Sequence, residues 1–228
     1  GYKCDRWLNE GEGSVENTMR NLTILLPARN EVEGLGVVVD MIPTSQLEEM
    51  GWNYRIIVVD GYSTDGTAKV AQDLGIKVYG QRDGLGKGMG LRQAFSYYLE
   101  SNDDALVMLD PDGTYDPRDI PNLLAKMDGG DYDVVIGSRL RGQMDDGAMG
   151  RINYIGNHIL TWAAVALYRN FVSDLCTGFW AFKRQSIAAM QLNSISFEIE
   201  AEMYAACSHN KMRIGEVPIR YHNRIGTA

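Results

Sequence analysis

The chain has 228 residues, of which 45% are hydrophobic and 23% are charged, a composition typical of a folded globular protein with one or two domains. Its 30 acidic and 22 basic residues leave a net charge of −8, and no block of five like charges occurs, which argues against nucleic acid as the main partner. The three cysteines, Cys4, Cys176 and Cys207, lie far apart without metal-ligand spacing. They indicate a reducing, cytosolic environment.

The ends of the chain carry no element of the predicted fold. The longest apolar stretch, from Ile159 to Tyr168, is well short of the roughly 20 residues that cross a bilayer. Residues 1–20 are polar and lack the apolar centre of a signal peptide, so we expect residues 1–21 to be a leader or a tag. Because no closing signal precedes Ala228, we expect the complete protein to continue beyond it.

From Leu22 onward, short β-rich runs alternate with longer helical patterns, which predicts a mostly parallel sheet with crossover helices. The predicted strands are residues 22–26, 55–59, 76–79, 105–109 and 134–136. The predicted helices are residues 34–50, 64–74, 87–100 and 117–127. The predicted fold class is therefore α/β, a Rossmann-like sheet flanked by helices.

Ligands of such sheets bind at the carboxyl ends of the strands. Four predicted strands are followed by segments rich in charge or glycine, namely residues 27–31, 60–67, 110–114 and 137–139. Any one of these segments could be no more than a turn. Four in succession at one edge predict a binding site there.

The alternation stops after Arg139. Residues 140–150 are predicted to form a mobile loop, and residues 151–168 have apolar side chains at helical spacing. This helix has two interpretations: it is either buried in the core, or it rests on a membrane with Trp162 and nearby tyrosines at headgroup level. A C-terminal region with an acceptor-binding or interfacial helix follows from the second interpretation.

Two carboxylates, Asp110 and Asp112, lie one residue apart directly after an apolar strand. Paired carboxylate oxygens at a strand end are suited to one hard divalent cation together with substrate phosphates. Mg²⁺ and Mn²⁺ prefer such ligands. The pair therefore predicts a metal site.

The glycine-rich segment at residues 84–90 matches neither common phosphate-binding fingerprint. A P-loop lysine is followed by Ser or Thr, whereas Gly88 follows Lys87, and a dinucleotide fingerprint requires glycine where Met89 stands. The segment remains either a solvated loop or a loop that presents Lys87 and Arg92 at a helix N-terminus, where a diphosphate can bind.

Taken together, these motifs resemble family 2 glycosyltransferases of the GT-A fold over residues 22–226. The similarity is carried by Pro-Ala-Arg-Asn-Glu, Val-Asp-Gly-Tyr-Ser-Thr-Asp-Gly-Thr, Gly-Lys-Gly, Asp-Pro-Asp and Gly-Ser-Arg, in this order along the chain. The segments at residues 174–182, 197–202 and 216–226 further resemble the subgroup of dolichyl-phosphate mannose and glucose synthases.

The resemblance implies an inverting, metal-dependent transfer of a hexosyl group from a nucleotide sugar to a polyprenyl phosphate. The donor would be GDP-mannose, UDP-glucose or UDP-GlcNAc. Residues 22–139 would form the nucleotide-sugar half and residues 140–228 the acceptor half of one catalytic domain. The protein would bind peripherally at the cytoplasmic face of a membrane, by apolar insertion, because its net negative charge disfavours attachment to anionic lipid.

The resemblance also implies roles for individual residues. Residues that would border the donor nucleotide or its diphosphate are Pro27, Ala28, Arg29, Glu31, Asp60, Lys87, Arg139 and Arg224, with Asp60 reading the base. Asp110 and Asp112 would bind Mg²⁺ or Mn²⁺. Two departures, Gly61 where many relatives have a second Asp and Thr114 where mannose synthases often have Gln, leave the base and the sugar undetermined.

On the acceptor side, the resemblance implies Arg151, Asn157 and Asp174 near the acceptor phosphate. Glu200 and Glu202 occupy the region of a catalytic base, but an i, i+2 spacing cannot place both on one helical face. They are alternatively surface charges.

Two other functions remain open from the sequence. A soluble family 2 enzyme that acts on a hydroxyl acceptor would need a general base, whereas a phosphate acceptor with a second pKa of about 6 is largely ionised already. A non-catalytic nucleotide-sugar-binding protein would retain the donor site without turnover.

Overall fold

The structure is a computed structural model that describes residues 19–82 and 84–226. Of the expected leader, residues 1–21, the first 18 residues lie outside the described residues. Its last two residues belong to the first strand, which begins at Arg20.

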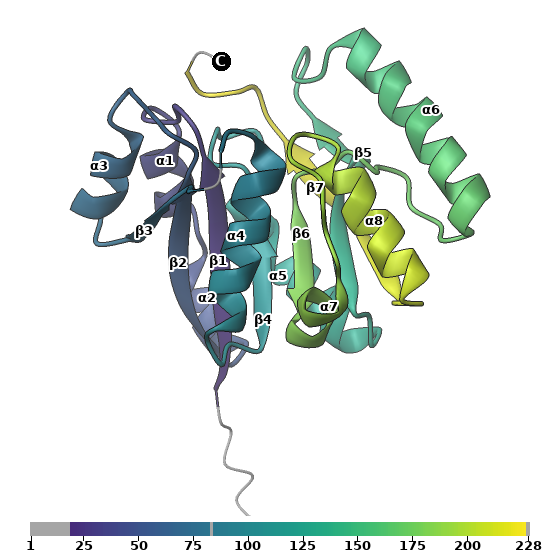
Figure 1. Cartoon of the computed structure of the whole chain (residues 1–228), viewed down its shortest axis with the longest axis horizontal. Helices are drawn as coiled ribbons and strands as arrows, with labels where there is room; N and C mark the ends of the chain where they lie inside the picture. The colour runs from purple at the N-terminus through teal and green to yellow at the C-terminus, as the bar shows by residue number, and fades with distance from the viewer. Residues whose placement is uncertain (1–18, 83, 227–228) are drawn as a thin grey trace, which may run out of the picture.

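A single seven-stranded sheet runs through the molecule in the order β3-β2-β1-β4-β6-β5-β7 (Figure 1). All neighbouring pairs are parallel except those of β6, which runs antiparallel to β4 and β5. The strands are β1 (Arg20–Ala28), β2 (Trp52–Asp60), β3 (Lys77–Gly80), β4 (Ala105–Met108), β5 (Val134–Met144), β6 (Trp180–Lys183) and β7 (Ile214–Tyr221).

Helices cover both faces of this sheet because its strands are apolar on both sides. In β1, Leu22, Ile24 and Leu26 pack into one buried cluster while Leu25 packs into the other, as expected for a period of two residues. The first cluster lies under α1 (Leu35–Asp40), α2 (Thr44–Glu49), α3 (Thr67–Asp73) and α5 (Ile120–Gly129), and the second under α4 (Lys87–Leu99), α7 (Arg184–Ala189) and α8 (Ile199–His209).

The predicted α/β fold class is confirmed, but some predicted elements were wrong. The predicted helix at residues 34–50 is two short helices separated at Pro43, because proline lacks the backbone N–H that a continuing helix needs. Strands β6 and β7 were not predicted. They lie beyond residue 139, where the pattern of alternation stops.

The predicted mobile loop at residues 140–150 was also partly wrong, because β5 continues to Met144. Its outer part pairs with β7, with Gln143 opposite Arg220. Gly142 allows the two backbones to approach, since a Cβ there would come within 1.7 Å of the carbonyl oxygen of Ile219.

Helix α6 (Arg151–Tyr168) lies at the outer edge of the molecule beside α8 (Figure 1). Only Asn157 and Thr161 of this helix are buried, so the interpretation as a core helix was wrong. In the described part of the chain, no helix has the length and apolar character needed to span a membrane.

Candidate active site

Three of the four polar segments predicted at strand ends lie along the carboxyl edge of the sheet, whereas the fourth, residues 137–139, lies within β5 and not after it. Strands β1, β2 and β4 are neighbours and parallel. Glu31 and Asp110 follow β1 and β4, and Asp60 is the last residue of β2, so all three lie at one end of the sheet. The backbone just after residues 27–31 passes close to the Asp110–Asp112 turn. Gly34 allows this approach, because a Cβ there would lie 2.6 Å from the carbonyl oxygen of Pro111.

Arg224, in the segment after β7, joins the carboxylates of Asp112 and Glu31. Its guanidinium donates to Asp112 Oδ2 at 2.8 Å and to Glu31 Oε1 at 2.6 Å. The backbone N–H of Ile225 donates to the carbonyl of Asp112 at 2.8 Å. Asp112 Oδ1 accepts from both the N–H (3.0 Å) and the hydroxyl (2.6 Å) of Thr114. The C-terminal segment is thus fastened onto the Asp110–Asp112 turn.

Lys87, in the first turn of α4, joins two further carboxylates, those of Asp110 and Glu200. Its Nζ lies 2.9 Å from Asp110 Oδ1 and 2.8 Å from Glu200 Oε1. Burial alone would lower the pKa of Lys87, but the charges of Asp110 and Glu200 outweigh it and raise the pKa above its ordinary value. Burial raises the pKa of Glu200, although Lys87 opposes the shift.

These residues have the donor chemistry of a divalent cation site. Asp110 and Asp112 offer carboxylate oxygens, and the four carboxylates that Lys87 and Arg224 contact carry more formal negative charge than these two cations carry positive charge. Within the described residues, no three His, Cys, Asp or Glu side chains form a group that could enclose a metal. A carboxylate pair can share such an ion with substrate phosphates.

Asp60 retains a free acceptor. Its Oδ2 accepts the backbone N–H of Ser63 at 3.1 Å, whereas Oδ1 is buried without a hydrogen-bond partner among the described residues. An unpartnered buried acceptor is costly unless a ligand or water satisfies it. Its neighbours in the expected nucleotide border are positioned by backbone contacts, since Gly61 N–H donates to the carbonyl of Ala28 at 2.8 Å. Pro27 is half-buried and Arg29 is exposed.

Arg139 has a different environment from the open phosphate contact that was expected. Its Nε and Nη2 donate to the two carboxylate oxygens of Asp174 at 2.8 and 2.7 Å, and its guanidinium carbon lies 5.3 Å from the ring centre of Tyr221. Asp174 is fully buried. Burial would lower the pKa of Arg139, but the neighbouring Tyr115, Asp174 and Tyr221 outweigh it and raise the pKa. The structure thus makes Arg139 part of a buried ion pair.

Of the three residues expected at the acceptor phosphate, the structure brings Asn157 and Asp174 into contact, whereas Arg151 takes no part in that contact. Asn157 donates to Asp174 Oδ1 at 2.6 Å and accepts from Thr161 at 3.1 Å, so both Asn157 and Asp174 are used to attach α6 to the sheet. Arg151 is exposed at the first residue of α6. Of the three, only Arg151 presents an exposed side chain.

The two candidate bases also separate, as their spacing predicted. Glu200 is buried beside Lys87. Glu202 faces a loop, where it accepts the backbone N–H groups of Asn193 and Ser194, both at 2.8 Å. Glu202 therefore holds backbone rather than facing the carboxylates, because residues two apart on a helix point in different directions.

Gly178 and Tyr115, which were not predicted as site residues, support the edge. A Cβ at Gly178 would lie 2.5 Å from Asp110 Oδ2, and the N–H of Gly178 donates to the buried hydroxyl of Tyr115 at 2.6 Å. Gly178 leads into β6. Since the insertion of β6 beside β4 was not predicted, the sequence held no signal for this contact beyond the glycine itself.

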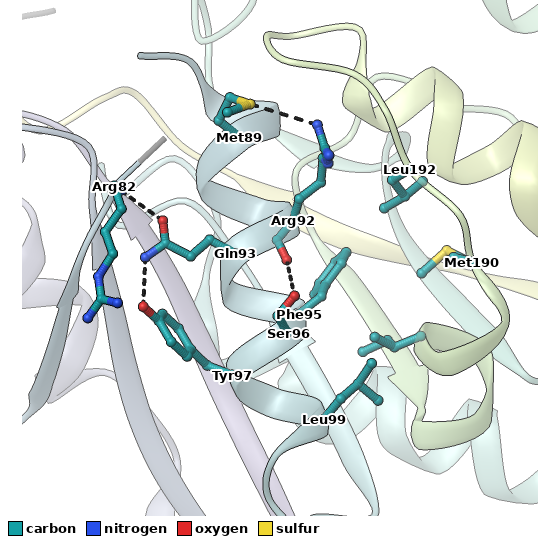
Figure 2. Close-up of a pocket in the computed structure, with 11 residues that line it drawn as sticks. Arg82, Met89, Arg92, Gln93, Phe95, Ser96, Tyr97, Leu99, Met190 and Leu192 are labelled. Carbon is teal, nitrogen blue, oxygen red and sulfur yellow. Dashed lines mark hydrogen bonds between the residues drawn. The ribbon is translucent and has the colours of Figure 1, made fainter. Parts of the chain in front are cut away.

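A cavity of about 480 Å³ lies away from this edge, between α4 and the segment that follows α7 (Figure 2). Its apolar side is formed by residues such as Phe95, Met190 and Leu192, with Arg82 and Arg92 at its polar margin. None of the four carboxylates described above lines it. The candidate active site is therefore the carboxyl edge of the sheet and not this cavity.

Comparison with solved structures assigns the fold. Glucosyl-3-phosphoglycerate synthase from Mycobacterium tuberculosis, solved in complex with Mn²⁺, UDP and glucosyl-3-phosphoglycerate, has a TM-score of 0.70 and 21% identity, over 98% of this chain and 79% of that one. The protein thus has the GT-A fold of glycosyltransferases.

Sequence comparison assigns the family. The family model described as "Glycosyl transferase family 2" matches residues 23–190, and the chain belongs to this family. It is 36% identical over 201 residues to glycosyltransferase AglJ of Haloferax volcanii, covering 88% of this chain and 63% of that protein. It is 30% identical over 224 residues to an undecaprenyl-phosphate mannosyltransferase of Micrococcus luteus, covering 90% and 85%.

A further relative is a hexosyltransferase of low-salt glycan biosynthesis, Agl6 of Haloferax volcanii, with 33% identity over 91% of this chain. The chain spans 63% of the length of the first Haloferax relative and 49% of that of the second.

Proposed function

We propose that this chain transfers a hexosyl group, with inversion, from a nucleotide sugar to a polyprenyl phosphate at a membrane surface. An oxygen of the acceptor phosphate forms the new bond to the anomeric carbon. The bond from that carbon to the β-phosphate oxygen breaks, and the nucleoside diphosphate leaves with the electron pair. Residues 22–139 serve the donor together with Arg224, and the rest of residues 140–228 serves the acceptor.

The donor half of this proposal rests on the charged carboxyl edge. Negative charge develops on the departing diphosphate, so cations fixed beside it favour the transition state. Lys87 and Arg224 are such cations, and both can exchange carboxylate partners for phosphate oxygens. Asp110 and Asp112 would hold Mg²⁺ or Mn²⁺, which supplies Lewis-acid neutralisation of the leaving group when bound. The unpartnered Asp60 Oδ1 is suited to an N–H group of the base.

The acceptor half is carried by one observation, the reversed amphipathicity of α6. The two buried residues of α6, Asn157 and Thr161, are polar, while its large apolar residues are exposed: Ile152, Tyr154, Ile155, Ile159, Leu160, Trp162, Leu167 and Tyr168. The exposed fractions of Ile152 and Trp162 reach 87% and 74%. An apolar helix face of this size in contact with water is unfavourable. A lipid surface would cover it.

The charge of α6 supports the same partner. The helix contains no Asp or Glu, and it begins at Arg151 and is followed by Arg169, although the chain as a whole has a net charge of −8. Basic residues flanking an apolar face favour anionic headgroups. The similarity to an undecaprenyl-phosphate mannosyltransferase points to the same class of acceptor. We place the protein at the cytoplasmic face, in keeping with the free thiols of Cys176 and Cys207.

A phosphate acceptor also agrees with the surroundings of Glu200. A phosphomonoester with a second pKa of about 6 is largely ionised at neutral pH and needs no general base. Glu200 is held by Lys87, which suits orientation of that lysine rather than proton transfer.

The experiment is product analysis by mass spectrometry. The protein is incubated with nucleotide sugars, Mn²⁺ or Mg²⁺, and either a short polyprenyl phosphate or the corresponding free polyprenol. We expect a glycosyl phosphopolyprenol from the phosphate and no product from the alcohol. Transfer only to a hydroxyl acceptor would replace this proposal by the base-requiring alternative. Binding of nucleotide without transfer or hydrolysis of any donor would leave only a non-catalytic binding protein.

A further inference from the structure

The loop between α7 and α8 lies directly on the glycine-rich start of α4. We refer to residues 193–196 as the clamp loop. A Cβ at Gly86 would come within 2.0 Å of the carbonyl oxygen of Ile195, and one at Gly88 within 2.5 Å of the carbonyl oxygen of Ser194. The N–H of Met89 also donates to the Ile195 carbonyl at 3.3 Å. Glycine at these positions is what lets the clamp loop come so close.

Lys87 lies between these two glycines. Its backbone is therefore covered by the clamp loop, while its side chain reaches the carboxylates of Asp110 and Glu200 at 2.9 and 2.8 Å. Because the start of a helix frays easily when its backbone N–H groups have no partners, the clamp loop restricts where the Lys87 ammonium can lie.

Three side chains fix the clamp loop from outside. Glu202 binds it with both carboxylate oxygens, accepting from Asn193 and Ser194 N–H at 2.8 Å each. Glu198 Oε1 accepts the backbone N–H groups of Ile195 and Ser196, both at 3.1 Å. Arg92 donates to the Asn193 carbonyl at 3.2 Å, and Figure 2 shows it reaching from α4 beside the cavity, towards Met89.

Glu202 carries no salt bridge within 4.0 Å among the described residues, and its two oxygens are occupied by loop backbone. Partial burial would raise the pKa of Glu202, but the N–H groups of Ser194 and Asn193 outweigh it and hold the pKa below its ordinary value. The carboxylate is thus ionised at neutral pH. Charged acceptors give the stronger class of hydrogen bond.

From this geometry we infer that Glu202 is a positioning residue for Lys87, which it holds at the donor edge through the clamp loop. Two carboxylates of α8 then act on the same lysine, because Glu200 binds the ammonium of Lys87 directly and Glu202 fixes the backbone around it. The role of Lys87 at the donor diphosphate rests on the proposed function, whereas the mechanical link from Glu202 to Lys87 does not.

The test measures how well Lys87 is protected. Intact protein is treated with an amine-acylating reagent, and the rate at each lysine is followed by mass spectrometry, with the exposed Lys69 as internal reference. In Glu202→Ala two backbone N–H groups lose their acceptor, so we expect acylation of Lys87 to accelerate at least about tenfold relative to Lys69. Glu202→Gln retains one acceptor oxygen and should lie between.

Two further variants separate positioning from general loss of stability. Asp133 lies just before β5, and its carboxylate accepts the backbone N–H of Arg213 at 2.8 Å. Asp133→Ala removes that acceptor and should leave Lys87 protected from acylation. Gly88→Ala places a methyl group against the Ser194 carbonyl and should expose Lys87 as Glu202→Ala does. It also serves if Glu202→Ala does not fold.

A second readout connects the link to the donor. Calorimetric titration with UDP and with GDP, each with Mn²⁺, should show weaker binding to Glu202→Ala and Gly88→Ala than to the unmodified protein and Asp133→Ala. Unchanged Lys87 acylation in folded Glu202→Ala, Glu202→Gln and Gly88→Ala, or an equal rise at every lysine, overturns the inference. If the unmodified protein binds neither nucleotide and transfers no sugar, the proposed function fails, while the acylation result still decides the inference.

Discussion

At the carboxyl edge of the sheet each cation contacts two carboxylates. Lys87 contacts Asp110 and Glu200, and Arg224 contacts Asp112 and Glu31. Burial raises the pKa of Glu31, an effect that Arg224 opposes. A cation that already touches two acceptors can exchange one of them for a phosphate oxygen without leaving the site. This arrangement makes single carboxylate substitutions informative.

Replacement of Asp110 or Asp112 by Asn should abolish transfer while the protein stays folded. The amide keeps the shape of the side chain but loses the charge that a divalent cation requires. Transfer assays with Mg²⁺ and Mn²⁺, with circular dichroism as the control for folding, check this. Full activity of Asp112→Asn, or of the unmodified protein in excess chelator, would contradict the metal site.

Lysine substitutions should distinguish the two arginines. Arg224→Lys keeps a charge at a half-exposed position but cannot bridge Asp112 and Glu31, so kcat should fall about 10²-fold with little change in Tm. Arg139→Lys breaks the bidentate contact with buried Asp174 and should cost about 1–3 kcal/mol of stability. Thermal unfolding and steady-state kinetics are measured together. A stable Arg139→Lys with reduced kcat would restore the phosphate contact predicted from the sequence.

Asp116 links stability to pH. Burial would raise the pKa of Asp116, but hydrogen bonds from Arg118 and the charge of Arg220 outweigh it and lower the pKa. A carboxyl with a lowered folded-state pKa stabilises the protein above its unfolded value of about 3.9, and this contribution is lost as pH falls through the folded pKa. Asp116→Asn should therefore destabilise by about 1–3 kcal/mol at neutral pH.

The same substitution should cost little well below the folded pKa of Asp116, since the aspartic acid is then neutral as well. Urea unfolding of both proteins at neutral and strongly acidic pH checks the sign. Equal destabilisation at both pH values would show that charge is not the cause.

Among the elements, α6 departs most from ordinary packing. A surface helix of a globular protein normally turns its apolar stripe to the core, whereas α6 is attached through the Asn157 and Thr161 hydrogen bonds to the Asp174 segment. The outward face of α6 can therefore contact a lipid surface without exposing residues of the core.

Ile155→Asp and Ile159→Asp should each weaken binding to anionic phospholipid vesicles by about 10- to 100-fold, because each removes an apolar side chain worth about 1.5–3 kcal/mol of burial. Their nucleotide binding and Tm should not change, since both side chains are exposed. Vesicle co-sedimentation is the measurement. Val37→Asp, at an exposed apolar position on α1, is the matched control. Vesicle binding that equals the control's would refute a lipid-facing α6.

Element prediction succeeded where local periodicity and end signals agreed. Residues 87–100 and 151–168 were predicted as helices, and α4 and α6 end within one residue of those bounds. Burial of the polar side of α6 could not be foreseen from periodicity, because an apolar stripe shows only that one face differs from the other. Which face meets the protein depends on Asp174, which is brought beside Asn157 by the fold.

For the molecule as a whole, the acceptor determines the pH dependence. If an ionised phosphate is the nucleophile, kcat/KM should decline on the acid side near the phosphate's second pKa of about 6. Glu200→Gln should then cost less than the roughly 10²–10⁴-fold typical of a lost general base. Rate profiles of both proteins with a short polyprenyl phosphate test this. A loss at the upper end of that range would assign Glu200 to proton transfer.

The α/β class, the strands that carry the motifs, and the position of three of the four polar segments at one edge could be predicted without a structure, whereas residues 137–139 lie within β5. Each of these follows from short-range information: apolar runs, glycine and acidic residues at strand ends, and the rule that parallel strands end together. The i, i+2 spacing of Glu200 and Glu202 likewise sufficed to separate their directions.

The partners of the charged groups, in contrast, are known only from the folded chain. Arg139 meets Asp174, Arg224 meets Asp112 and Glu31, and Glu202 meets the clamp loop, across separations of 35, 112, 193 and 8 or 9 residues. The first three depend on the sheet, in which β6 lies between β4 and β5 and β7 pairs with β5. Composition and spacing carry no information about such pairings, because a side chain's partner is set by where the backbone returns and not by its neighbours along the sequence.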